Sequence, residues 1–69
     1  MPDERMVGKM GRVSGQIGPE KLGEVMIPVR GGTEHFHAYA ADREDEIETG
    51  ARVVVVEDHP PRTVIVTRM

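Results

Sequence analysis

Three histidines are the side chains of this sequence best suited to metal chemistry. His35 and His37 are separated by one residue, so on a β-strand both would project from the same face. Two such imidazoles can share a metal ion, but a site needs three or four converging ligands, and His59 or Glu24 would have to supply the third. Because most strand histidines have no ligand role, the sequence predicts no metal site. His35 and His37 remain the only metal candidates.

An acidic stretch, residues 42–48, is the second feature with chemical potential. It holds five carboxylates and one arginine, hence a charge of −4, which leaves +1 for the rest of a chain whose net charge is −3. A calcium loop of the EF-hand type needs glycine at its sixth position, where Ile47 stands. The stretch is therefore interpreted as a solvated connector. The alternative is a docking surface for a basic partner, made by Glu44, Asp45 and Glu46.

Catalytic groups are sparse. The chain has no cysteine, and its one serine, Ser14, lies in a glycine-rich segment without the signature of a nucleophile elbow. His59 follows Asp58, but neighbours in sequence do not make a catalytic dyad. The glycines at 8, 11 and 15 would cradle a phosphate only if a helix followed them, and none is predicted. The sequence therefore predicts no enzyme and no cofactor.

The elements that must position these residues are five short strands in a single domain. Residues 1–6 read as a polar tail or linker, and residues 7–69 as the domain. No apolar run approaches the roughly 20 residues of a membrane span, and no signal peptide begins the chain. Glycine-rich or alternating segments predict strands over residues 8–17, 24–30, 33–40, 51–57 and 63–68.

The second and third strands form the clearest local pattern. Val25, Ile27 and Val29 alternate on one face before a predicted Gly31-Gly32 turn. After the turn, Phe36, Ala38 and Ala40 alternate toward the core, which leaves His35, His37 and Tyr39 facing outward. Pro28 has no N–H for a ladder, so we expect it where the strand is locally unpaired. The predicted core is Val13, Val25, Ile27, Val29, Phe36, Ala38, Val53, Val55, Val64 and Val66.

The remaining segments select the architecture. The acidic connector is expected to contain at most a short helical turn, pinned by Ile47. The valine run at 53–56 is typical of a strand that is covered on both faces. A bent first strand, three strands, a connector and two strands predict an all-β fold, a small five-stranded barrel of the OB type. An SH3-like barrel is the competing topology.

Nucleic acid is the ligand that an OB-type barrel suggests. The predicted outer face offers Arg30, His35, His37 and Tyr39, and Lys21 and Arg62 lie on neighbouring loops. Single-strand binding usually needs several exposed aromatic rings and a basic surface, whereas this face has one aromatic ring on an acidic chain. Single-stranded nucleic-acid binding is therefore the alternative function.

Several short motifs, taken in order, resemble a known family. The segment 7–13 (VGKMGRV) opens the domain, and 23–27 (GEVMI) has the pattern glycine, x, apolar, x, apolar. The segments 36–38 (FHA), 47–56 (IETGARVVVV) and 63–66 (TVIV) complete the series. Together they resemble the C-terminal soluble domain of the NfeD family, from about Val7 to Arg68. The acidic connector is longer than the family pattern, and the family's membrane segment is absent from this chain.

The resemblance implies a five-stranded OB barrel that follows transmembrane helices and serves protein interaction with stomatin- or flotillin-like membrane scaffolds. It implies no catalytic residue. We therefore expect a non-enzymatic interaction module on the cytoplasmic side, at the membrane face. A homodimer through a sheet edge left open by Pro28 and the glycine-rich first strand is a further expectation. The predicted interaction surface is Arg30, His35, His37, Tyr39, Glu44, Asp45 and Glu46.

Overall fold

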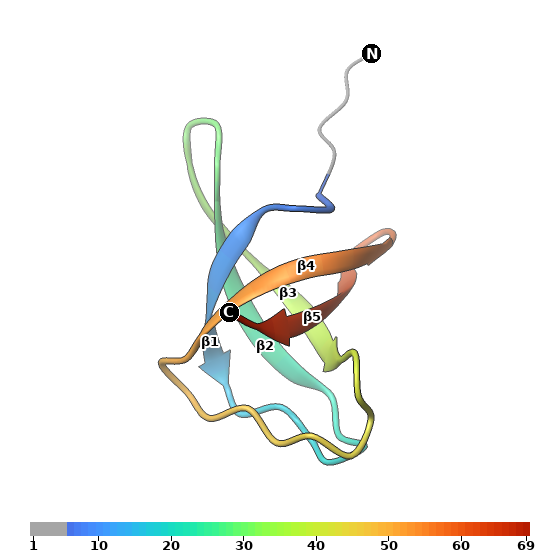
Figure 1. The fold of residues 1–69 in the computed structure, drawn as a ribbon. Helices are drawn as coiled ribbons and strands as arrows, with labels where there is room; N and C mark the ends of the chain where they lie inside the picture. Colours follow the sequence, from blue (N-terminus) through green and yellow to red (C-terminus); the bar gives the residue numbers. More distant parts are fainter. Residues whose placement is uncertain (1–5) are drawn as a thin grey trace.

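The computed structural model describes residues 6–69, and these form a closed barrel of five strands (Figure 1). Each strand pairs with two neighbours in the order β1-β2-β3-β5-β4, and β4 pairs back onto β1. Only β3 and β5 run parallel. This arrangement confirms the predicted all-β barrel of the OB type. The strands are β1 (Met10–Gly15), β2 (Gly23–Val29), β3 (Gly32–Ala40), β4 (Arg52–His59) and β5 (Thr63–Arg68).

The barrel interior is filled by β-branched side chains that alternate along the strands, together with Phe36 and two alanines. Alternate residues face inward because successive side chains of a strand point to opposite faces. Every predicted core residue except Val29 is buried, and Val29 is half-buried against the core. Ile17, Ala40 and Ile47 complete the buried set. A filled interior leaves ligands only the outer surface.

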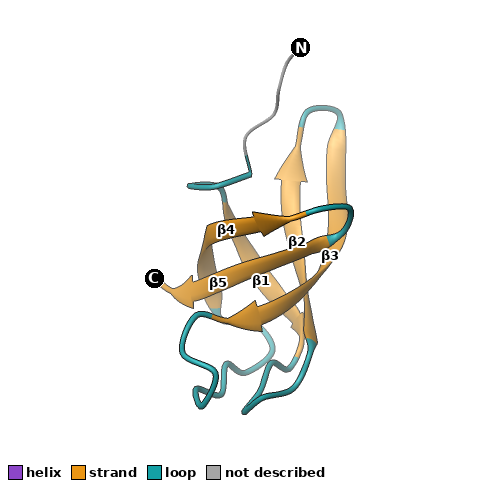
Figure 2. Cartoon of the chain, turned by 90° about the vertical axis from the view of Figure 1, so that its right-hand side faces the viewer, coloured by secondary structure: helices purple, strands orange, loops and turns teal. Residues whose placement is uncertain are grey.

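The β2–β3 hairpin extends beyond the rest of the barrel, as Figure 2 shows. Its two-residue turn is Arg30-Gly31, because Val29 pairs with Gly32. The predicted Gly31-Gly32 turn was therefore wrong by one residue. Gly31 has a φ of 86°, a left-handed conformation that glycine adopts without strain.

Pro28 lies in this extension. It faces Thr33 across the hairpin, while the pairing of β2 with β1 ends at Met26. The missing N–H therefore falls where β2 has already parted from β1, as expected.

The acidic connector crosses the end of the barrel away from the hairpin tip (Figure 1). It contains turns and bends but no helix, within the expected limit of at most a short helical turn. Instead, Ile47 exchanges two backbone hydrogen bonds of 3.0 Å with Ile17 in the β1–β2 loop. Both isoleucines are fully buried. The connector is therefore held by a strand-like bridge and one buried side chain. A helix would need several buried side chains to be held in the same place.

Strand β4 corrects a second expectation. Val53 and Val55 are buried, but Val54 is half-buried and Val56 is exposed, so the valine run is covered on one face only. Nothing in residues 6–69 packs over the outer face of the barrel there. The strand also continues to His59, past an irregularity between Val55 and Glu57, which shortens the following loop to residues 60–62.

Close approach between strands occurs at one glycine in particular. A Cβ atom on Gly23 would lie 2.5 Å from the carbonyl oxygen of Gly15, which leaves no room for any other residue.

At the start of the chain, residues 1–5 of the predicted tail lie outside the described residues. Met6 packs against the core. The described part of the chain contains no helix long and apolar enough to cross a membrane.

Candidate interaction surface

The two strand histidines lie where the alternation predicted. His35 and His37 are exposed on the outer face of β3, opposite Met26 and Glu24 of β2 respectively. Glu24 accepts a hydrogen bond of 3.2 Å from the Ser14 hydroxyl. His59, the other proposed third ligand, is on β4 and bonds with Glu57 at 2.8 Å. Residues 6–69 bring no three metal-ligating side chains together.

Tyr39 is further along β3 and is only half-exposed. The guanidinium carbon of Arg43 lies 5.3 Å from the centroid of its ring, so a connector cation covers part of the aromatic face. The other ring of the barrel, Phe36, carries Arg62 at 4.9 Å in the same way, and Arg62 also pairs with Glu34 at 3.1 Å. An arginine therefore lies over each ring, which reduces the aromatic surface available for stacking a base.

Arg30 occupies the tip of the β2–β3 hairpin, apart from the histidines. A groove of about 310 Å³ lies beside it, lined by Met6, Val29, Arg30, Glu34 and Phe36. The seven predicted surface residues therefore do not form one continuous patch. The hairpin tip carries Arg30, the outer face of β3 carries the histidines, and the connector lies at the opposite end of the barrel (Figure 1).

The connector is ordered by its own carboxylates. The amide of Glu44 donates to Asp42 Oδ1 at 3.1 Å, and that of Glu46 donates to Asp45 Oδ1 at 2.9 Å. Gln16 Nε2 donates to the Glu46 carboxylate, which ties the connector to the β1–β2 loop. Of the three predicted docking carboxylates, Asp45 and Glu46 are therefore engaged within the molecule. The carboxylate of Glu44 has no partner among residues 6–69.

Glu48 ends the acidic run and is the group whose titration the fold alters. A hydrogen bond from its own backbone amide lowers the pKa of its carboxyl below the ordinary 4.5, and Arg68 lowers it further by hydrogen bonding and charge. Arg68 Nη1 lies 3.2 Å from Glu48 Oε1, while its Nη2 donates to the Glu46 carbonyl at 2.6 Å. Arg68 thus fastens the last strand to the connector.

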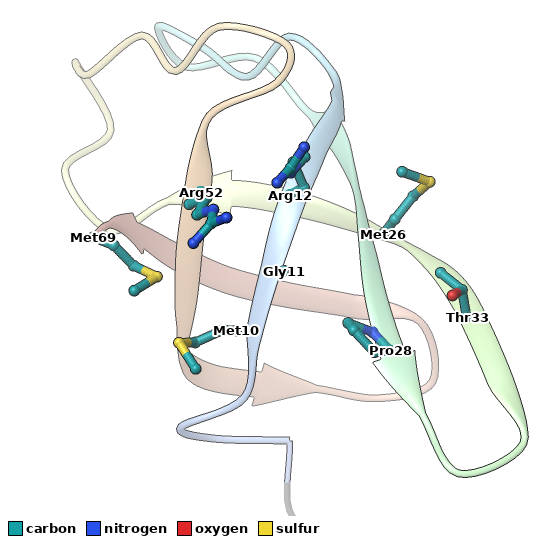
Figure 3. Close-up of a pocket in the computed structure, with 8 residues that line it drawn as sticks. All are labelled: Met10, Gly11, Arg12, Met26, Pro28, Thr33, Arg52 and Met69. Atoms are coloured by element: carbon teal, nitrogen blue, oxygen red, sulfur yellow. The ribbon is translucent and has the colours of Figure 1, made fainter.

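A larger groove lies on the outer face of β4, β1 and β2, and the sequence patterns did not indicate it. It has a volume of about 410 Å³, and Figure 3 shows its lining side chains. Methionines and Pro28 supply the apolar part, and two arginines on neighbouring strands supply the charge. Its walls include Met10, Arg12, Met26, Pro28, Arg52 and Met69.

Arg12 and Arg52 are 40 positions apart and meet only because β4 closes the barrel onto β1, where they form a register pair. The outward position of each follows from strand alternation. Their proximity follows only from the closure.

The groups considered for catalysis are held in structural contacts. The Ser14 hydroxyl bonds with a carboxylate, and His59 bonds with Glu57 rather than with its neighbour Asp58. Both His59 and Glu57 are more than half exposed to solvent. An exposed pair on an outer strand has no walls to exclude water or orient a substrate. The His59–Glu57 pair therefore has the properties of a surface contact rather than those of a catalytic pair.

Comparisons with known proteins agree with this architecture. The family model of the NfeD C-terminal domain matches residues 10–67. The soluble domain of the NfeD protein YuaF from Bacillus subtilis is 31% identical with a TM-score of 0.76, and the match covers 88% of this chain and 70% of that one.

A second solved structure is the C-terminal domain of stomatin operon partner protein 1510-C from Pyrococcus horikoshii. It is 38% identical with a TM-score of 0.66, and the match covers 93% of this chain and 88% of that one. A search of curated proteins found no match. The family model spans most of the barrel, from the first residue of β1 to the penultimate residue of β5. The chain therefore belongs to the NfeD C-terminal domain family.

Proposed function

We propose that this domain is a non-enzymatic module that binds a stomatin- or flotillin-like scaffold protein at the cytoplasmic face of a membrane. The observation that carries the proposal is the likeness, over 93% of this chain, to a domain whose own protein is named as a stomatin operon partner. The buried side chains that fill the barrel support it, because a filled interior leaves partners the outer surface.

The proposed contact surface has two parts. The first is the hairpin with the exposed outer face of β3, where Arg30, His35 and His37 carry no ion pair within residues 6–69. The second is the acidic connector, where the Glu44 carboxylate is available to a basic group of the partner. Tyr39, half-exposed and with Arg43 over its ring, lies on β3 toward the connector end.

A binding titration with the stomatin-like protein of the same organism tests the proposal. We expect saturable binding, weakened at least tenfold by the triple change Arg30→Gln, His35→Ser and His37→Ser, a loss of about 1.4 kcal/mol. Glu44→Gln reports on the connector separately. The control is Lys21→Gln, which removes an exposed charge from the β1–β2 loop. No binding at about 100 μM partner, a very weak affinity for a specific complex, would contradict the proposal.

A further inference from the structure

We infer that the groove between β4, β1 and β2 binds an extended partner segment that carries large apolar side chains next to carboxylates. The inference rests on the proposed function and names the chemistry of the partner. It is carried by two observations: an arginine pair without an acidic partner, and an apolar surface beside it that residues 6–69 leave uncovered.

The arginine pair is the first observation. Val13 donates its N–H to Ala51 and Val55 donates to Lys9, so Arg12 and Arg52 form a non-hydrogen-bonded pair between β1 and β4. Side chains approach most closely in such pairs, and like charges placed opposite each other destabilise a sheet. Both arginines are exposed, and no Asp or Glu side chain of residues 6–69 lies within ion-pair distance of either.

This local excess of positive charge stands out on a chain whose net charge is −3. Glu24, on the same outer face, accepts the hydrogen bond from Ser14 instead. An anionic group in the groove would relieve the repulsion between the two guanidinium groups and accept charge-assisted hydrogen bonds from both. From charge complementarity we therefore expect the ligand to carry at least one carboxylate.

The apolar surface is the second observation. Met10 and Met69 are 57% and 63% exposed, and Met26 and Pro28 line the β2 side of the groove (Figure 3). Methionine side chains are flexible and adapt to different apolar ligands, which suits a surface that is completed by binding. Large exposed apolar side chains gathered beside fixed charges mark an interaction site.

The backbone here also favours an extended ligand. The pairing of β1 with β2 ends at Arg12 and Met26. If the register continued, the next residue on the same side of β1, Met10, would face Pro28, which has no N–H to donate. The main chain of β1 therefore borders the groove where its ladder with β2 has stopped, and an extended segment can lie along it.

Other classes of anion fit less well. Anionic membranes are recognised by clusters of about four to eight basic residues, and this groove presents two. Single-stranded nucleic acid needs aromatic rings for stacking, and the groove has none. A short acidic and apolar segment of a protein matches both the charge and the surface.

The test is an NMR titration of the whole chain with a short acetylated and amidated peptide. Every second residue of the peptide is, in order, leucine, leucine, glutamate and glutamate, and serines stand between them. In an extended peptide these four side chains all face the same side. We expect saturable shifts centred on the amides of Met10, Gly11, Met26 and Arg52. The double variant R12Q/R52Q, and the peptide with glutamines for glutamates, should each bind about tenfold more weakly. Lys21→Gln should bind as the wild type does.

Three outcomes would overturn the inference. The first is an absence of shifts at about 1 mM peptide, and the second is equal binding by R12Q/R52Q. The third is movement of the same amides by phosphatidylglycerol vesicles or an oligonucleotide but not by the peptide. A structural role is tested separately, because R52Q should be at least as stable as the wild type in low salt once the like-charge pair is gone. A clear loss of stability in R52Q would mean that the pair serves the fold.

The same double variant separates this inference from the proposed function. If R12Q/R52Q binds the stomatin-like protein normally while the hairpin variant does not, the groove inference fails and the proposed function stands. If the wild type binds the peptide but not the stomatin-like protein, the proposed partner is wrong and the groove chemistry holds.

Discussion

Phe36 is the largest side chain of the buried core and the clearest test of the packing. The residue is 8% exposed, and the Arg62 guanidinium lies over its ring. Replacing Phe36 by alanine should cost about 3–5 kcal/mol, because the cavity left behind cannot collapse fully in a small barrel. That is a large part of the stability of a domain of this size. Urea unfolding followed by circular dichroism measures the loss.

The control for this variant is Val56→Ala on the same barrel. Val56 is 39% exposed on the outer face of β4, so its truncation should change the stability by about 0.5 kcal/mol or less. If Phe36→Ala unfolded at the same urea concentration as the wild type, the result would contradict the packing of Phe36 in the core.

Glu48 makes the pH dependence of stability testable. Because the fold lowers the pKa of this carboxyl below 4.5, its ionised form stabilises the native state. The contribution is therefore fully present above pH 4.5 and is lost as the pH falls through the lower pKa of the folded state. Glu48→Gln should flatten the stability curve on the acid side.

Thermal melts between neutral and acidic pH measure this effect. Glu44→Gln is the matched control, since Glu44 has no ion pair among residues 6–69. Equal acid sensitivity in Glu48→Gln and the wild type would mean that neither the backbone hydrogen bond nor the Arg68 contact of Glu48 stabilises the fold in solution.

At the scale of single residues, strand alternation alone predicted which side chains face outward. His35 and His37 lie outside and Phe36 lies inside because the strand repeat is two. Alternation cannot tell which outward residues of different strands become neighbours. The pairing of Arg12 with Arg52 depends on the closure of β4 onto β1, which no local pattern contains.

At the scale of elements, the β2–β3 hairpin shows why a correct face does not ensure a correct register. Moving the turn from Gly31-Gly32 to Arg30-Gly31 shifts the pairing by two residues. Since the side-chain period is also two, both registers place Val25, Ile27 and Phe36 inside. The hydrophobic pattern therefore could not distinguish the two registers. The backbone preference of the turn residues determines which register forms.

That preference leads to a prediction at Gly31. Its positive φ disfavours a β-branched residue, so Gly31→Val should cost about 1–2 kcal/mol. Gly31→Asn should lose much less, because asparagine tolerates the left-handed conformation. Apart from Gly31 and its two chain neighbours, no residue lies within 4 Å of the site that a Cβ would occupy, so crowding by the rest of the fold cannot explain a loss. Equilibrium unfolding of both variants measures the difference.

The neighbouring turn residue supplies the control. Arg30 is exposed and has no positive φ, so Arg30→Val tests the loss of side-chain polarity in the same turn without the backbone strain. Equal costs for Gly31→Val and Arg30→Val would contradict the proposed role of the backbone.

The connector shows a different limit of prediction. Its single apolar residue, Ile47, was correctly identified as the anchor, and the low apolar content correctly excluded a long helix. The bridge to Ile17 could not be predicted, because it joins two loops that come together only when the barrel forms.

At the scale of the whole molecule, the distribution of charge separates the two functions that an OB-type barrel suggests. The acidic connector covers one end. Among residues 6–69, the arginines without an ion pair are Arg30 at the hairpin tip, Arg43 in the connector, and Arg12 and Arg52 in the groove. Outward aromatic surface is limited to Tyr39, which is half-exposed and has Arg43 over its ring. A strand of nucleic acid would meet neither a continuous basic path nor several exposed aromatic rings.

We therefore expect no binding of a fluorescent oligothymidylate of about 15 nucleotides, long enough for an OB domain, even at about 50 mM salt, where phosphate contacts are strongest. Fluorescence anisotropy measures this directly. Binding that weakens steeply between about 50 and 200 mM salt, and is lost in Tyr39→Ala, would establish nucleic-acid recognition instead. Tyr39 distinguishes the two cases, because weak attraction to exposed arginines would survive its removal, whereas stacking would not.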